Sequence, residues 1–395
     1  MELDRILCTH VGSLVRPAEL VALLLKEQDG EHVPESVLAA QLEHSVNHVV
    51  AQQKAHQVDV VSDGEFGKAR SWAQYINSRL GGVELRTDVA RNVGFNIGKD
   101  RTDFAEFYQE YEASQGVAGM GRQMKLAQGA WTVTGPIGYR GHAQLQADIQ
   151  RLKSAMALHG VSEGFLPVVA PTSAVAALVD RHYGDEEKLL FALADALAEE
   201  YRAIIDSGLY LQVDDAYLAS MYDVMVLRGP AAEYRRWAER GVAALNRALA
   251  GLPDERIRYH VCWGSWNGPH SNDVNLRDIV DLVLEVNAGA YALEMANPRH
   301  EHEWQVWKQV ALPAGKRLIP GVVSHCTNII EHPDLVSERL VRLARVVGRE
   351  NLLAGTDCGF AQGPFTRRVH PSIQWAKLRA LADGARQATQ ELWGR

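Results

Sequence analysis

Two potential metal ligands lie two residues apart in the segment Arg258-Tyr-His-Val-Cys-Trp-Gly264. The segment is typical of the end of a β-strand, where the side chains of residues i and i+2 point to the same face. The imidazole of His260 and the thiol of Cys262 should therefore project together, and these two donors are half of a tetrahedral zinc site. Alternatively, Cys262 is a small apolar filler of a buried strand, which is the usual role of such a cysteine.

Apolar runs that end in polar residues or glycine recur along the chain and predict the strands that would position this pair. Strands are expected at residues 58–63, 131–135, 165–170, 209–213, 258–263, 291–294, 317–323 and 352–357. Helices are expected at residues 18–57, 142–159, 185–207, 230–249, 278–287, 333–347 and 373–392. This alternation predicts a (β/α)8 TIM barrel. The short apolar run at residues 6–12 is expected at the barrel mouth rather than in the sheet.

One catalytic domain is expected to span residues 1–395, because no low-complexity linker divides the chain. This length suits a TIM barrel with insertions. Residues 86–128 fit no simple strand–helix unit. They contain Phe104, Phe107, Tyr108 and Tyr111 at helical spacing, so they predict a helical insertion into the barrel.

Ionisable residues follow several of the predicted strands, and TIM-barrel active sites lie at the carboxyl ends of the strands. His260, Cys262, Glu294 and Cys358 come from three such ends. Together they would supply one nitrogen, one oxygen and two sulfurs, a suitable shell for Zn²⁺. Taken singly, Cys358 could be a turn cysteine, and Glu294 could be a buried carboxylate paired with Arg299. A barrel that brings all four to one rim favours the zinc site.

The overall composition argues against several classes of partner. The formal charge is −8, from 41 basic and 49 acidic residues, and no basic cluster occurs, so nucleic acid and anionic membrane surfaces are not expected to bind. No apolar segment approaches the roughly 18–20 residues that span a bilayer. The acidic N-terminus has too short an apolar run for a signal peptide. The cysteines are expected to be thiols or metal ligands of a cytoplasmic protein; they are Cys8, Cys262, Cys326 and Cys358.

The chain resembles the catalytic barrel of cobalamin-independent methionine synthase and its thiol-alkylating relatives. The matching stretches are Thr9-His-Val-Gly-Ser13, Ser62-Asp-Gly-Glu65, Gln212-Val-Asp-Asp215, His260-Val-Cys262, Glu294 and Gly355-Thr-Asp-Cys358. Others look closer to the 2-hydroxypropyl-coenzyme M lyase (epoxyalkane:coenzyme M transferase) branch, namely Cys262-Trp-Gly264, Gly268-Pro-His270, Ala296-Asn-Pro-Arg-His-Glu-His302, Thr327-Asn328 and Glu331-His-Pro333. Asp214-Asp215 departs from the Asp-Glu of typical methionine synthases, and we expect no pterin-binding half before the barrel, so folate use stays open.

The resemblance implies a zinc-dependent enzyme that activates a small thiol as a zinc-bound thiolate for alkyl transfer. The thiol would be homocysteine-like or coenzyme M-like, and the alkyl donor would be a methyl donor or an epoxide. By the same resemblance, Glu65 and Asp214 would hold an amino group, and His10 and Ser13 are candidates for a carboxylate or sulfonate. His325, just past its strand, is positioned to donate or shuttle a proton to the leaving group.

Other interpretations of the same residues stay open. Asp-Gly-Glu at residues 63–65 is also good turn chemistry, Asp214 could cap a helix, and His325 could simply be hydrogen-bonded at a strand end. A decarboxylase of the uroporphyrinogen type would use a related barrel without a metal, and a non-catalytic barrel could bind zinc or a thiol. The sequence does not decide whether the chain forms a homo-oligomer.

Overall fold

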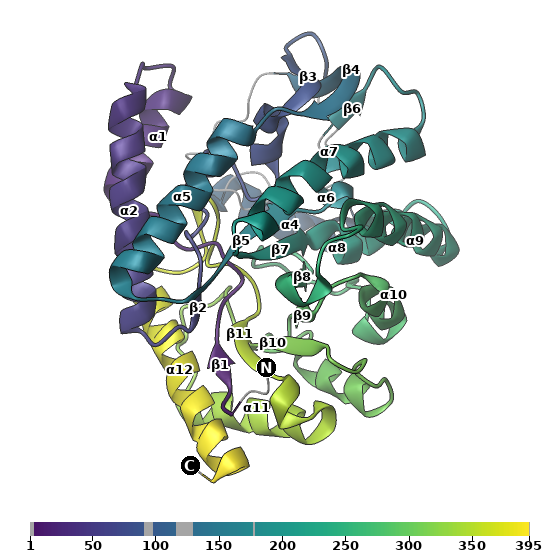
Figure 1. The fold of residues 1–395 in the computed structure, drawn as a ribbon. Coiled ribbons are helices and arrows are strands. Elements are labelled where there is room, and N and C mark those ends of the chain that lie inside the picture. The colour runs from purple at the N-terminus through teal and green to yellow at the C-terminus, as the bar shows by residue number, and fades with distance from the viewer. Residues whose placement is uncertain (1–3, 91–97, 116–128, 177, 395) are drawn as a thin grey trace.

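The computed structural model describes residues 4–90, 98–115, 129–176 and 178–394. Its centre is an eight-stranded parallel sheet in the order β1-β11-β10-β9-β8-β7-β5-β2 (Figure 1). The strands are β1 (Leu7–Cys8), β2 (Val60–Val61), β5 (Glu163–Val169), β7 (Tyr210–Asp215), β8 (Ile257–Val261), β9 (Ala290–Leu293), β10 (Arg317–Val323) and β11 (Leu353–Thr356). The edge strands meet where the Asp59 N–H donates to the Cys8 carbonyl, at 2.9 Å. The sheet is therefore a nearly closed barrel, as the sequence predicts.

Helices follow the strands on the outside of the barrel (Figure 1). The longer ones are α1 (Ala18–Gln28), α2 (Glu35–Ala55), α5 (His142–His159), α7 (Glu186–Asp206), α8 (Ala216–Val226), α9 (Ala231–Ala248), α11 (Pro333–Val347) and α12 (Pro371–Trp393), and the shorter ones are α6 (Pro171–Val175) and α10 (Val280–Glu285). The single helix predicted over residues 18–57 is two helices. Gly30, with φ +82°, follows the first, and Pro34 precedes the second, because neither residue suits a helix interior.

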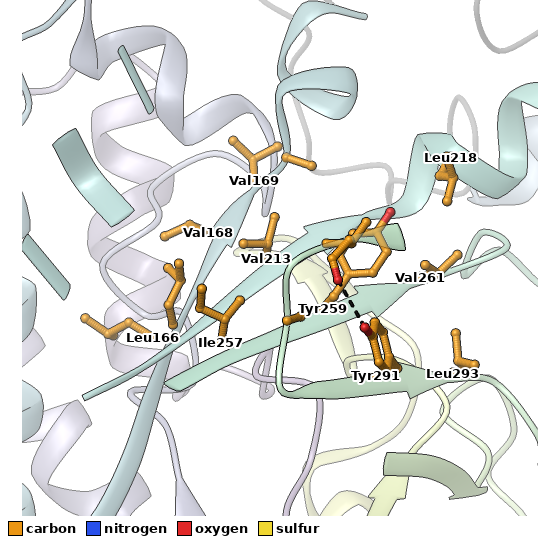
Figure 2. Close-up of a cluster of buried hydrophobic side chains, with 14 of the residues drawn as sticks. Leu166, Val168, Val169, Val213, Leu218, Ile257, Tyr259, Val261, Tyr291 and Leu293 are labelled. Carbon is orange, nitrogen blue, oxygen red and sulfur yellow. Dashed lines mark hydrogen bonds between the residues drawn. The ribbon is translucent and has the colours of Figure 1, made fainter. Parts of the chain in front are cut away.

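Alternation along the strands separates an outer apolar face from a polar barrel interior. Val213, Tyr259, Val261, Tyr291 and Leu293 are at most 1% exposed and belong to the large core cluster that also contains helix residues (Figure 2). The residues between them point the other way because side chains of a strand alternate. The inward-facing positions of β7 and β8 are polar and buried; they are Gln212, Asp214, Arg258 and His260. The fold thus delivers ionisable groups to the inside of the barrel.

Two strand predictions are wrong. Residues 6–12 were expected at the barrel mouth, but Leu7 and Cys8 form barrel strand β1 and pair with Leu353 and Ala354 of β11. The run is only two residues long as a strand, too short for a strand pattern to appear. Residues 131–135 were expected in the barrel, but β4 (Ala130–Tyr139) lies in a separate three-stranded sheet, β3-β4-β6, with β3 (Leu80–Arg86) and β6 (Leu178–Asp180). The partly exposed residues of β4 suit such a sheet, because a parallel barrel strand is covered on both faces.

The predicted insertion near residues 86–128 contains two helices among its described residues. It contains α3 (Lys99–Asp103) and α4 (Ala105–Gln115), while residues 91–97 and 116–128 lie outside the described residues. The described helices include none that is long and apolar enough to cross a membrane.

Candidate active site

Three donor atoms converge at the carboxyl ends of β8 and β11. His260 is in β8, Cys262 follows that strand directly, and Cys358 follows β11. One ligand atom from each of these buried side chains lies within 4.8 Å of the other two. The two Sγ atoms are 3.3 Å apart. His260 and Cys262 project together as the strand spacing predicts, and barrel closure adds a sulfur from nearly one hundred residues further along the chain.

A carboxylate fixes the orientation of the His260 ring. The Nδ1–H group donates to Asp214 Oδ1 at 3.0 Å, and Gln212 Nε2 donates to the same oxygen at 2.9 Å. With Nδ1 carrying the proton, Nε2 of a neutral ring presents its lone pair. Nε2 is buried and has no hydrogen-bond partner among the described residues. In metal sites, a ligating histidine commonly donates its other ring N–H to a carboxylate. Asp214 and His260 have this arrangement, with the free Nε2 beside the two thiols.

The protonation of the two thiols also favours a cation at this position. The hydrogen bond from Cys262 and the neighbouring His260 lower the pKa of the Cys358 thiol well below its ordinary value. The same hydrogen bond, together with burial, raises the pKa of Cys262 well above its ordinary value. The hydrogen bond between the two sulfurs thus favours the thiolate at Cys358 and the thiol at Cys262. Burial lowers the pKa of His260, but the hydrogen bond with Asp214 and the negative charge of Cys358 outweigh burial and raise it to about 10. A bound divalent cation would displace these protons.

Glu294, the fourth predicted ligand, lies near these donors but outside the group of three described above. It follows β9, and its Oε1 accepts from the Trp263 N–H at 2.9 Å. Its Oε2 accepts from Asn297 Nδ2 at 2.7 Å. Among the described residues these two groups, rather than Arg299, are its hydrogen-bond partners. Burial and the negative charge of Cys358 raise the pKa of Glu294 to about 7. Its role as a ligand stays a prediction.

Two predicted substrate-binding carboxylates line the cavity that opens onto the thiols. Glu65 and Asp214 both border it, together with His260, Cys262 and Cys358. Glu65 Oε1 is 2.9 Å from Lys68 Nζ, whereas Oε2 is buried without a hydrogen-bond partner in the described part of the chain. Glu65 also has φ +63°, a left-handed conformation that costs free energy in a residue other than glycine and is common at functional sites.

The other two predicted substrate-binding residues differ in their surroundings. Ser13 borders the cavity, and its buried Oγ has no partner among residues 4–90 or the other described segments. Both ring nitrogens of His10 have protein partners. The Gly12 N–H donates to Nδ1 at 3.0 Å, and Nε2–H donates to Gln53 Oε1 at 2.8 Å. Burial lowers the pKa of His10 to about 4. The structure therefore brings Ser13 to the cavity and ties His10 to the barrel interior.

His325 follows β10 and is 2% exposed. Neither of its ring nitrogens has a hydrogen-bond partner among the residues that the structure describes. Burial, opposed by the charge of Cys358, lowers its pKa to about 4. The alternative role, a structural hydrogen bond at the strand end, is therefore not found among the described residues. A buried imidazole without hydrogen bonds costs free energy.

The cavity has a volume of about 220 Å³ and combines charged groups with aromatic walls. Its aromatic lining residues are Trp72, Tyr108, Tyr111, Tyr217, Trp266 and Phe365. Its cationic lining residues are Arg70, Arg101 and Arg368. The insertion helices α3 and α4 supply part of this wall, because Arg101 belongs to α3 and Tyr108 and Tyr111 belong to α4.

Several residues that support the site were not identified from the sequence. Lys68 forms an ion pair with Glu65. The spacing of three residues between a base and an acid could have suggested this pair. Asn297 donates to both Glu294 and Asp357, at 2.7 and 3.3 Å. No pattern in the sequence indicated Arg368, which borders the same cavity and directly follows the β12–β13 hairpin (Ala361–Gly363 and Thr366–Arg367).

Comparisons with known proteins identify the family of the chain. Residues 115–378 match the family model described as "Cobalamin-independent synthase, Catalytic domain". The chain is 25% identical over 385 residues to the protein YxjH of Bacillus subtilis, covering 95% of this chain and 92% of that one. It is 23% identical over 412 residues to 2-hydroxypropyl-CoM lyase of Xanthobacter autotrophicus, covering 97% and 94%.

A solved structure has the same fold. The B12-independent methionine synthase from Shewanella, in complex with selenomethionine, superposes with a TM-score of 0.71 at 20% sequence identity and covers 99% of this chain and 100% of that one. The matched model includes β8, β9, β10 and β11 and so the strand ends that carry His260, Cys262, Glu294 and Cys358. The chain belongs to the catalytic-domain family of the cobalamin-independent synthases.

Proposed function

We propose that this protein is a zinc-dependent enzyme that transfers an alkyl group to or from the sulfur of a small thiol. The observation that supports it best is the convergence of His260, Cys262 and Cys358 within 4.8 Å beside a cavity of about 220 Å³. One nitrogen and two sulfurs suit Zn²⁺, and three protein ligands with an open fourth position are typical of catalytic zinc. Glu294 is the proposed fourth ligand, to be displaced by the substrate thiol.

The protein's own residues would bind and orient the thiol. A bound zinc ion would supply a Lewis acid that lowers the thiol pKa, so that the sulfur attacks as a thiolate. His325 would accept the proton released by the thiol and return it to the leaving group or to the opened epoxide oxygen. The cavity volume of about 220 Å³ is below the roughly 300–1,000 Å³ of pockets for drug-sized ligands, which supports small substrates.

A zinc determination on the purified protein tests this proposal directly. We expect about one zinc per chain, and we expect addition of a small thiol to change the absorption spectrum of a cobalt-substituted sample. Protein that contains no zinc when purified and binds none when zinc is added would instead support the metal-independent decarboxylase. Zinc binding without turnover of any thiol would support a non-catalytic barrel.

Removal of the Asp214 charge should weaken zinc binding. Asp214→Asn keeps an oxygen near His260 Nδ1 but loses the carboxylate that orients the ring and increases its basicity. Loss of such a partner typically lowers metal affinity by about 10–100-fold. Competition with a chromophoric chelator would measure the zinc affinity. Glu65→Gln is the matched control, since Glu65 borders the same cavity but is not a hydrogen-bond partner of His260; unchanged affinity in Asp214→Asn would contradict the role of the pair.

The charge of Glu65 should decide which class of thiol binds. Two carboxylates, Glu65 and Asp214, favour an ammonium group and repel a sulfonate; at 4 Å the repulsion is about 1 kcal/mol in water and several times more in a dry site. Glu65→Gln is expected to raise KM for an amino-thiol such as homocysteine by roughly 10–100-fold, the equivalent of one charged hydrogen bond. KM for a sulfonate thiol such as coenzyme M should stay unchanged or fall.

Steady-state kinetics with both thiols would measure this difference. Glu106→Gln, on the exposed face of α4, is the control for removal of a carboxylate. An equal rise in KM for both thiols would mean that Glu65 does not contact the substrate.

We also propose that the 395-residue chain acts as one catalytic domain in the cytoplasm. Its cysteines are free, which is usual in a reducing compartment. The thiol is bound as a small molecule, and the alkyl donor is either a methyl donor or an epoxide.

A further inference from the structure

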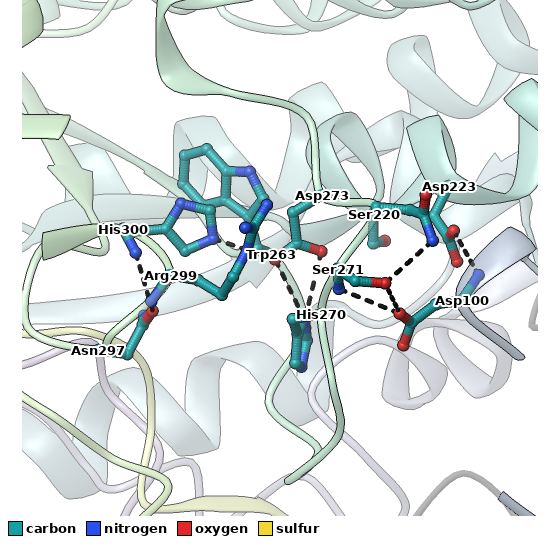
Figure 3. A network of polar contacts seen from close by, with 12 residues as sticks. Asp100, Ser220, Asp223, Trp263, His270, Ser271, Asp273, Asn297, Arg299 and His300 are labelled. Carbon is teal, nitrogen blue, oxygen red and sulfur yellow. Dashed lines mark hydrogen bonds and ion pairs between the residues drawn. The ribbon is translucent and has the colours of Figure 1, made fainter. Parts of the chain in front are cut away.

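Asp100, in the insertion helix α3, accepts hydrogen bonds from two different parts of the chain. Its Oδ1 accepts from the Ser271 N–H at 3.0 Å and from the Ser271 hydroxyl at 2.6 Å. Its Oδ2 accepts from the Tyr108 hydroxyl at 2.6 Å. The Asp100 N–H in turn donates to Asp223 Oδ1 of α8 at 2.9 Å. Figure 3 shows Asp100 between Ser271 and Asp223. One buried carboxylate therefore ties the insertion to the loop after β8.

The residues that Asp100 holds form part of the cavity wall. Tyr108 and Trp266 both border the cavity, and the indole N–H of Trp266 donates to the Tyr108 hydroxyl at 2.9 Å. The indole stacks on His270, with ring centroids 4.2 Å apart. It also covers Gly264 and Gly268, where no side chain would fit. Trp266 is thus held by the stacked His270 ring and, at its N–H group, by the Tyr108 hydroxyl.

The loop after β8 is itself under constraint. His270 has φ +52°, an uncommon conformation for a residue with a side chain. Its ring nitrogens face the Trp266 carbonyl at 3.0 Å and Asp273 at 3.2 Å. Asp273 is also 3.1 Å from His300 (Figure 3). The loop also bonds to the insertion through Trp266 and Tyr108, and Asn272 Nδ2 donates to Asp103 Oδ2 of α3 at 3.0 Å. Asp100 strengthens this connection, because its two carboxylate oxygens accept from Ser271 of the loop and from Tyr108 of α4.

We infer that Asp100 is a positioning residue that holds Tyr108 and Trp266 as a fixed wall beside Cys262 and Cys358, and so limits the size of the alkyl donor that reaches the reacting sulfur. The inference deepens the proposed function, because it assumes that alkyl transfer takes place at these thiols. It assigns small electrophiles as the donor class. The wall takes no part in the reaction; it limits which molecules can reach the sulfur.

Alkylating reagents of different size can test this without knowledge of the natural substrate. The full-length protein is treated with a chelator and then with iodoacetamide or with a fluorescein maleimide, and peptide mass spectrometry measures the labelling rates of Cys262 and Cys358. In the wild type the small reagent should react and the bulky one should react slowly. Asp100→Ala should raise the rate with the bulky reagent roughly 10-fold, as expected for loss of hydrogen bonds to a charged group, and should leave the rate with iodoacetamide within about two-fold.

Three comparisons separate a change of access from general loosening. Tyr108→Phe removes only the hydroxyl between Asp100 and Trp266 and should show the same selective rise if Asp100→Ala does not fold. Asp100→Asn, which retains an acceptor for Ser271, should lie between wild type and Asp100→Ala. Glu106→Ala, an exposed carboxylate of α4, should behave as wild type.

The proposal fails if folded Asp100→Ala and Tyr108→Phe label at wild-type rates with both reagents, or if both reagents accelerate equally. Hydrogen exchange should rise at the Ser271 amide and in α3 of Asp100→Ala. Exchange that rises throughout the barrel would identify a purely structural role. Zinc content is measured in parallel. Wild-type protein without zinc would refute the proposed function, whereas the labelling rates would still show whether Asp100 controls access to the cysteines.

Discussion

Replacement of Cys358 or Cys262 with serine is expected to remove zinc and abolish alkyl transfer while the fold survives. A serine hydroxyl is not deprotonated at neutral pH and is a poorer zinc ligand than a thiolate. Removal of a direct ligand should therefore weaken zinc binding by more than the roughly 10–100-fold that follows loss of an outer partner. The barrel should persist, because its apolar core extends over all of its strands and most of its helices and does not depend on one ion.

Elemental analysis after dialysis, circular dichroism and turnover measure the three parts of this prediction. Cys326→Ser is the matched control. Cys326 is half-buried near the same rim, but its sulfur contacts Ser324 Oγ at 3.3 Å, so this variant should keep both zinc and activity. Full zinc retention in Cys358→Ser and Cys262→Ser would refute the assignment of the site.

The barrel and its donors could be predicted because both follow from local patterns. Side chains alternate along a strand, so a few residues of sequence were enough to predict that His260 and Cys262 project to the same face. Cys358 could be added because all parallel strands of a barrel end at one rim. The family resemblance selected the same residues, and the three donor atoms lie within 4.8 Å of one another.

The contacts that refine the site depend on tertiary structure and could not be read in this way. Strand β1 is recognisable as a strand only through its pairing with β11. The partners of Glu294 are a backbone N–H and the side chain of Asn297, and neither a spacing rule nor a charge pattern predicts such bonds. The insertion was expected to be helical, but its connection to the loop after β8 through Asp100 spans 171 positions in the sequence.

The cavity is lined by acidic residues of the barrel and by a basic residue of the insertion. Glu65 and Asp214 border it near the barrel interior, whereas Arg101 belongs to the insertion. The aromatic lining of the cavity includes the Tyr108–Trp266 pair. Under the proposed function, charged groups of this cavity would hold a polar thiol with its sulfur at the cysteines, and the aromatic wall would contact an uncharged alkyl group.

His325→Ala is expected to slow turnover by about 10²–10⁴-fold, the usual contribution of a general acid or base, without loss of zinc. His325 is 2% exposed and its ring nitrogens have no hydrogen-bond partners in the described residues, so neither nitrogen is already engaged by a described protein group. Because burial lowers its pKa to about 4, His325 is neutral at pH 7. A neutral imidazole can accept the thiol proton and return it to the leaving group.

The sign of this pKa shift fixes the expected pH dependence. A base with a pKa of about 4 stays unprotonated at neutral pH, so the deficit of His325→Ala should be constant from about pH 6 to pH 8. His325→Gln separates the two possible roles, because glutamine can form a hydrogen bond but cannot shuttle a proton. Proton transfer predicts that Gln is as slow as Ala and that added imidazole partly restores His325→Ala. Activity restored by Gln would make His325 a hydrogen-bonding group, and wild-type turnover of His325→Ala at every pH would make it structural.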